Sequence, residues 1–271
     1  MTSLSVLRVL DLSEGVAGAF CTKLLAGFGA EVIKIERPGA GDPLRRYGPF
    51  PDDLPHPEKS ALSLYLNTGK KSITLDIAQR DGALIFRRMV EEAEVVVETF
   101  APGYLAKLGL DYGSLAHIKP RLVMTSVTPF GQDGPSEPDR EPLKTDGHQA
   151  EYLAGLHAFA ATATVAFSAD ATEVGQHIDI AVLECLASML EPSPAHAAHE
   201  APGLGARVFF QEIEHPAAGR LTYPGPPFRL EAMPWQAARA PLLGEHNEQV
   251  YCDELGLSRE ELATLQASGV V

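Results

Sequence analysis

The fold is decided by residues 6–42, whose sequence is VLRVLDLSEGVAGAFCTKLLAGFGAEVIKIERPGAGD. Two short apolar runs, 6–12 and 32–35, are rich in β-branched residues, and each ends in polar residues, as buried parallel strands do. Between them, residues 15–29 carry apolar side chains at helical spacing. The stretch therefore predicts a strand, a helix and a second strand in one βαβ unit.

The connection within this unit predicts where a ligand binds. A right-handed crossover makes the two strands parallel and brings residues 13–18 and 36–42 together at their carboxyl ends. Ligands of open α/β sheets bind at that edge. The Gly-x-Gly-x-x-Gly spacing of dinucleotide-binding folds is absent, and Gly15 and Gly18 alone are weak evidence for it.

The alternation of strands and helices continues along the chain. Repeated units of this kind predict an α/β fold, a Rossmann-like open parallel sheet with flanking helices. The segment 195–205 is rich in Ala, Pro and Gly and is expected to be a joint. Apolar periodicity predicts strands at 72–75, 95–97 and 122–127, helices at 81–93, 104–108, 112–118, 151–167 and 258–267, and a strand followed by a helix within 178–190.

Composition restricts the class of protein. The chain has 271 residues, of which 45% are hydrophobic and 21% are charged, so it can bury a sizeable core. The net charge of −14 argues against nucleic acid as a partner, because phosphate backbones bind to basic faces. A few local cations would still suffice for a single nucleotide.

The sequence shows no clear signal for membrane insertion, secretion or disulfide formation. No run is long and apolar enough to span a bilayer, and the N-terminus lacks the pattern of a signal peptide, so we expect a cytoplasmic protein that does not bind membranes. The three cysteines, Cys21, Cys185 and Cys252, are widely spaced and predict neither a disulfide framework nor a metal site.

Ordered motifs along most of the chain resemble one family, the class III CoA-transferases. This family includes formyl-CoA transferase, carnitine CoA-transferase and α-methylacyl-CoA racemase. The motifs that carry the resemblance are IKIERPG at 33–39, NTGKKSI at 67–73, ETFAPG at 98–103, GQDGP at 131–135, AGLH at 154–157 and GQHID at 175–179.

The chain is shorter than the family pattern implies. One piece that the family has is missing between 134–135 and 139–143, and another near 200–201, where a small domain with a glycine-rich loop is expected. We therefore expect residues 1–200 to form a Rossmann-like CoA-binding large domain. Residues 201–271 would form a C-terminal strap packed on it, with the family's small domain largely missing.

The resemblance implies that Glu151 is the catalytic carboxylate, at a position where the family has aspartate. The alternative, left open by the residues themselves, is an exposed carboxylate that complements the dipole at a helix N-terminus. His148 and His157 are more often surface or packing residues than bases when they stand alone. Arg45 and Arg46 are either substrate-facing or surface cations.

The resemblance also implies a nucleotide site for CoA or an acyl-CoA, bound as substrate, and no metal. It places Arg37 near the adenosine with Lys70 beside it, Thr99 and Phe100 against the nucleotide, and Lys107 toward the phosphates. Arginine suits this task because its planar guanidinium bonds phosphate with two parallel hydrogen bonds.

The function implied is transfer of CoA between carboxylic acids. In the family's reaction the carboxylate attacks the thioester to form a mixed anhydride, and the enzyme then carries CoA as a thioester. Two alternatives are a non-catalytic CoA-binding remnant, or partner of a full-length paralogue, and an α-methylacyl-CoA racemase or epimerase. The resemblance further implies a homodimer, provided that a chain of this length can close the interlocked ring.

Overall fold

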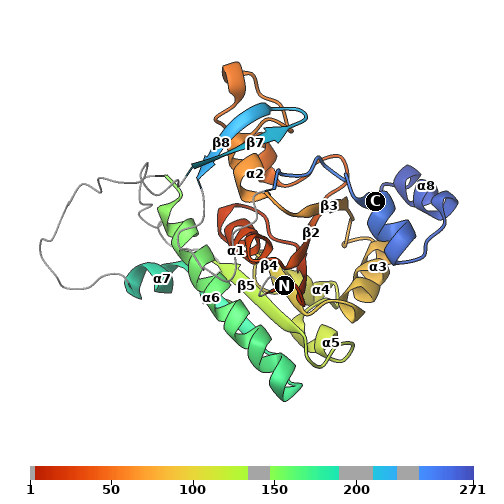
Figure 1. Ribbon diagram of the computed structural model, residues 1–271. Helices are drawn as coiled ribbons and strands as arrows, with labels where there is room; N and C mark the ends of the chain where they lie inside the picture. The colour runs from red at the N-terminus through yellow and green to blue at the C-terminus, as the bar shows by residue number, and fades with distance from the viewer. Residues whose placement is uncertain (1–3, 134–146, 189–209, 225–237) are drawn as a thin grey trace, which may run out of the picture.

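A computed structural model describes residues 4–133, 147–188, 210–224 and 238–271 (Figure 1). The predicted alternation of strands and helices is confirmed over the first two of these ranges. The strands there are β1 (Arg8–Asp11), β2 (Glu31–Glu36), β3 (Lys71–Thr74), β4 (Val95–Glu98), β5 (Val123–Thr128) and β6 (His177–Ala181). The α-helices are α1 (Val16–Gly27), α2 (Ala61–Leu66), α3 (Arg80–Glu91), α4 (Tyr104–Lys107), α5 (Tyr112–Ala116), α6 (Gln149–Thr172) and α7 (Val182–Ser188).

The six strands form one sheet in the order β3-β2-β1-β4-β5-β6. Each neighbouring pair is parallel, with Val9 of β1 opposite Val32 of β2 on one side and Val95 of β4 on the other. This is the strand order of the doubly wound Rossmann fold, in which the chain reverses direction across the sheet between β1 and β4. The predicted fold class is confirmed.

Two separate cores cover the two faces of the sheet. On one face, α3, α4 and α5 bury Phe86, Leu105 and Leu115 against strand residues such as Leu10 and Ile33. On the other face, α1 and α6 pack together, and Figure 1 shows them side by side. Alternation along each strand supplies both cores, because successive side chains point to opposite faces.

The helix α6 is longer than the predicted 151–167 and changes one expectation. With 24 residues, from Gln149 to Thr172, it is long and apolar enough to cross a membrane by length and composition alone, and the expectation that no segment meets this test was wrong. A core helix of a soluble protein passes the same test. In this structure α6 packs along α1 and over β5, with a third of its most apolar window buried.

The C-terminal part of the chain packs on the sheet's α3 face and beside α2. Here β7 (Phe210–His215) and β8 (Gly219–Pro224) form an antiparallel hairpin that the sequence analysis missed. A π-helix, η3 (Gln249–Glu254), and α8 (Arg259–Ala267) follow, and Tyr251, Leu262 and Val270 join the core on the α3 face. Figure 1 shows α8 beside α3, far from it in sequence. The joint at 195–205 and the segments at 134–146 and 200–201 lie outside the described residues.

Candidate functional site

A cavity opens at the carboxyl ends of β1, β2 and β4, where the strand order reverses. Residues that follow each of these strands line it, among them Glu14 after β1, Arg37 after β2 and Phe100 after β4. The crevice at such a point is where open α/β sheets bind their ligands, because the loops on its two sides diverge there.

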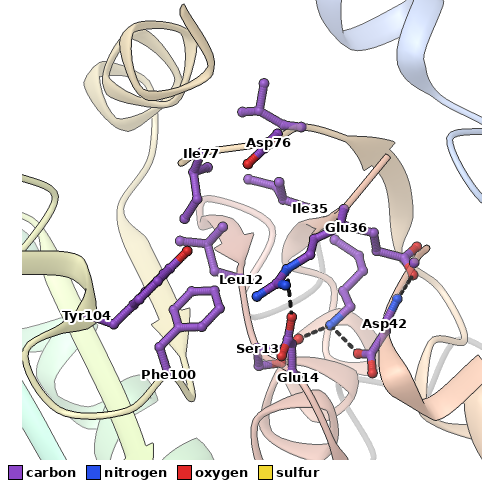
Figure 2. A pocket seen from close by; sticks show the side chains of 14 residues that line it. Leu12, Ser13, Glu14, Ile35, Glu36, Asp42, Asp76, Ile77, Phe100 and Tyr104 are labelled. Atoms are coloured by element: carbon purple, nitrogen blue, oxygen red, sulfur yellow. Dashed lines mark hydrogen bonds and ion pairs between the residues drawn. The ribbon is translucent and has the colours of Figure 1, made fainter. Parts of the chain in front are cut away.

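One wall of the cavity is aromatic and aliphatic. The rings of Phe100 and Tyr104 lie with centroids 4.9 Å apart, tilted by 44°. Leu75 and Ile77 line the same cavity, and Figure 2 shows Ile77 above the two rings. Aromatic faces and aliphatic side chains of this kind suit a flat heteroaromatic ring, such as a nucleobase.

The opposite wall carries an exposed ion pair. Arg37 Nε lies 3.4 Å from Glu14 Oε1, with 60% of the Arg37 side chain and 33% of the Glu14 side chain exposed. Thr99 fixes the backbone of Glu14 in both directions. Its hydroxyl accepts from Glu14 N at 2.7 Å and donates to Glu14 O at 2.8 Å.

Beneath the loops, buried charges join the first strand to its neighbours. Lys34 Nζ lies 2.8 Å from Asp42 Oδ2 and 3.7 Å from Asp11 Oδ1, and it donates to the carbonyl of Ser13. Lys70 Nζ lies 3.0 Å from Asp11 Oδ2. Burial alone would raise the pKa of Asp11, but Lys34 and Lys70, together with hydrogen bonds from the Ser13 and Thr22 hydroxyls, lower it to about 2.

A second buried pair holds the loop after β2. Arg45 Nε and Nη2 donate to the two oxygens of Glu36, at 2.7 and 2.8 Å, and Ser72 Oγ donates to Glu36 Oε2 at 2.9 Å. Arg45 is therefore neither of the two alternatives weighed from the sequence. It is buried and paired within the protein, whereas Arg46 is exposed.

The candidate nucleophile lies at the other side of the same sheet edge. Glu151 is in the first turn of α6, with 27% of its side chain exposed, and its Oε1 lies 3.5 Å from Nδ1 of His148. One turn later, a Cβ on Gly155 would meet the carbonyl oxygen of Ala17 at 2.5 Å. This close packing places the start of α6 beside the first turn of α1, which follows Glu14.

Comparisons with known proteins decide the family. Residues 4–138 match the family model described as CoA-transferase family III. The chain is 38% identical over 205 residues, 68% of its length, to the BbsE subunit of succinyl-CoA:(R)-benzylsuccinate CoA-transferase from Thauera aromatica. It is 35% identical over 210 residues, 69% of its length, to succinate–glutarate CoA-transferase from Agrobacterium fabrum. The chain belongs to CoA-transferase family III.

The chain spans about half the length of these curated relatives, 50% of the first and 52% of the second. Among solved structures, a CaiB/BaiF family protein from Brucella suis superimposes with a TM-score of 0.77 at 23% identity, covering 93% of this chain and 99% of that one. This likeness supports the fold alone.

Within this CoA-transferase family fold, the structure brings some of the implied site residues together. Arg37 and Phe100 line one cavity, and Thr99 anchors the loop of Glu14 beside them. Lys107 ends α4, one turn after Tyr104, and is exposed.

Two implied residues are not brought to the cavity. Lys70 is fully buried, and besides Asp11 its ammonium contacts Ala19 O and Asn67 Oδ1, each at 3.0 Å. Burial lowers the pKa of Lys70, although Asp11 opposes the shift. Glu151 is not among the residues that line the cavity. The roles implied for both remain predictions.

Glu14 and Tyr104 were missed by the sequence analysis. Tyr104 begins α4 shortly after Phe100, and an aromatic pair soon after a buried strand was a usable signal. Glu14 follows the first strand, as Arg37 follows the second, so the parallel pairing already placed them at one edge. Among the described residues, no group of three or more His, Cys, Asp and Glu side chains is arranged to hold a metal ion.

Proposed function

We propose that this chain supplies the CoA-binding site and the nucleophile of a class III CoA-transferase, which moves CoA between carboxylic acids through Glu151. The observation that carries the proposal is the cavity at the reversal of strand order. It places a flat apolar wall, Phe100 and Tyr104, opposite the guanidinium of Arg37. Adenine and a phosphate group, joined in one ligand, require this combination.

Glu151 would perform the chemistry. Its carboxylate attacks the thioester carbonyl and expels the CoA thiolate, which leaves a mixed anhydride of Glu151 and the donor acid. The thiolate then attacks the glutamyl carbonyl, releases the donor carboxylate and forms a glutamyl-CoA thioester. The acceptor carboxylate attacks this thioester, expels the CoA thiolate and forms a mixed anhydride with Glu151. The thiolate then attacks the acceptor carbonyl of this anhydride, which gives the acceptor-CoA thioester and regenerates the Glu151 carboxylate.

The position of Glu151 supports this role in two ways. It lies in the first turn of α6, where unpaired backbone N–H groups favour negative charge. It also stands at the sheet edge that holds the cavity, because Gly155 brings α6 against the first turn of α1. The pantetheine arm of a CoA bound beside Phe100 would have to cross the loop of Glu14 to reach it.

The experiment that tests the transferase is capture of the intermediate. The protein is incubated with succinyl-CoA and then treated with borohydride, which reduces a glutamyl-CoA thioester, and the peptides are analysed by mass spectrometry. We expect modification at residue 151 in the wild type and in Glu151→Asp, and none in Glu151→Gln. Glu173→Gln, at the far end of α6, is the matched control and keeps the modification.

One observation favours a second candidate, a CoA-binding partner subunit without chemistry of its own. Two relatives are named as subunits, the one from Thauera aromatica and the beta subunit of succinyl-CoA–L-malate CoA-transferase from Chloroflexus aurantiacus. A protein that binds CoA but forms no adduct at Glu151 would support this candidate and contradict the transferase. Exchange of the α-proton of an acyl-CoA for deuterium in deuterated water, without an adduct, would instead indicate a racemase.

Light scattering tests the proposed homodimer.

A further inference from the structure

The polar wall of the cavity carries the ion pair of Arg37 and Glu14. Among the described residues that line it, Lys34 and Arg37 are the cations. Lys34 is buried and held by Asp42 and Asp11, so its charge is directed inward. Arg37 is the lining cation with an exposed head group, and that head group faces the carboxylate of Glu14. An anion that binds Arg37 therefore lies next to the carboxylate of Glu14.

Glu14 is held firmly in this position. Thr99 binds its backbone N–H and carbonyl, and the N–H of the next residue, Gly15, donates to Asp42 Oδ1 at 3.4 Å. Asp42 is itself fixed by Lys34 at 2.8 Å. The loop therefore cannot carry Glu14 away from the cavity without breaking these bonds, and the ion pair opens by rotation of the Glu14 or the Arg37 side chain.

A carboxylate and a phosphate are alternative partners for a guanidinium. Both accept its parallel hydrogen bonds, and two such anions on one exposed arginine repel each other. We propose that Glu14 is a specificity-determining residue that occupies the place of a phosphate on Arg37 and tempers the affinity for the phosphorylated end of the ligand. This inference rests on the proposed function, since CoA is the phosphorylated ligand concerned.

The proposal predicts that removal of the negative charge of Glu14 increases the affinity for CoA. In calorimetric titrations with CoA, Glu14→Gln should bind about 3- to 10-fold more tightly than the wild type, because an exposed pair no longer competes. The control Glu260→Gln makes the same change of net charge on α8, outside the lining residues, and should leave the affinity unchanged. In an Arg37→Ala background the gain should fall below about 2-fold.

Adenosine separates competition for phosphate from a general change in the cavity. It carries no phosphate, so its affinity, measured by competition against CoA, should be the same for the wild type and Glu14→Gln. An equal gain for adenosine and CoA would overturn the proposal. Weaker binding of CoA by Glu14→Gln would also overturn it, because Glu14 would then be a ligand contact.

The failure of the proposed function gives a different result. A wild-type protein that is folded and binds no CoA contradicts the CoA site itself. If the wild type binds CoA and Arg37→Ala weakens that binding, the site stands. In that case, if Glu14→Gln binds CoA with the same affinity as the wild type, only the role proposed for Glu14 is rejected.

Discussion

At the residue scale, buried charge positions the loops around the cavity. Lys34 contacts Asp11 at the end of β1, Asp42 after β2 and the carbonyl of Ser13, so one ammonium joins the two loops that carry Glu14 and Arg37. Lys70 also contacts Asp11, although the two residues are 59 positions apart in the sequence. No local sequence pattern indicates such a contact. The position of Arg37 beside a buried strand end, by contrast, was predictable from strand pairing.

Loss of the Lys34 ammonium should destabilise the protein strongly. Lys34→Met keeps the length of the side chain but leaves Asp42 and Asp11 with less compensation in the interior. Breaking one partner of a buried pair costs about 3–5 kcal/mol in the free energy of unfolding. Urea unfolding measures this loss. Arg259→Met removes a pair whose arginine is 84% exposed, and should change the free energy by less than about 1 kcal/mol.

Asp11 should make stability depend on acid pH. Its pKa in the folded protein is about 2, below the ordinary value of 3.8, so the unfolded chain takes up the proton first as the pH falls. Asp11 therefore contributes about 2 kcal/mol to the free energy of unfolding. This contribution is fully present above pH about 4 and is lost as the pH falls toward 2. Urea unfolding at several pH values tests this in Glu245→Gln, which removes another carboxylate with a pKa of about 2. A free energy that stays constant from pH 4 to pH 2 in that variant would contradict the role of Asp11.

At the element scale, regular strands and helices were predictable, and the hairpin was not. Short continuous apolar runs predicted β1 to β5, because strands of a parallel sheet are buried on both faces. The β7-β8 hairpin has a Pro-Ala-Ala connection at 216–218, and the alternating polar and apolar residues at 220–223 were a usable signal that the abundance of proline nearby obscured. The predicted bounds of α6 stopped at Phe167 because polar residues follow, yet the helix continues to Thr172.

The contact between α6 and α1 should be sensitive to a single methyl group. A Cβ on Gly155 meets the backbone oxygen of Ala17, which cannot rotate away, so Gly155→Ala should cost about 1–3 kcal/mol despite the better helix propensity of alanine. Thermal unfolding measures the loss, and Ala160→Leu adds bulk on the exposed side of α6 as a control. If Gly155→Ala is as stable as the wild type, α6 does not pack on α1 as described.

At the scale of the whole molecule, the C-terminal segment contributes to the core of the sheet. Tyr251 is fully buried, and its hydroxyl donates to the carbonyl of Thr74 at 2.8 Å, across 177 residues of sequence. Contacts over such a separation leave no local pattern in the sequence. The expected division into a domain at 1–200 and a strap at 201–271 remains a prediction.

Truncation of this tyrosine should destabilise the whole sheet. Tyr251→Ala leaves a cavity in the core on the α3 face, and large aromatic truncations of this kind cost about 3–5 kcal/mol. Tyr251→Phe removes only the hydrogen bond and should cost about 1–2 kcal/mol. Urea unfolding ranks the variants, with Tyr47→Ala, at an exposed position, as the control. Equal stability of Tyr251→Ala and the wild type would show that the segment does not pack there.

The central claim is that CoA binds in the cavity between Arg37 and the Phe100–Tyr104 pair. The most direct test is calorimetric titration of the folded protein with CoA, repeated on Arg37→Ala and Phe100→Ala. We predict micromolar binding that each substitution weakens by about tenfold or more, since each removes one half of the recognition. Absence of binding by the folded wild type, or binding that both variants retain unchanged, would contradict the claim.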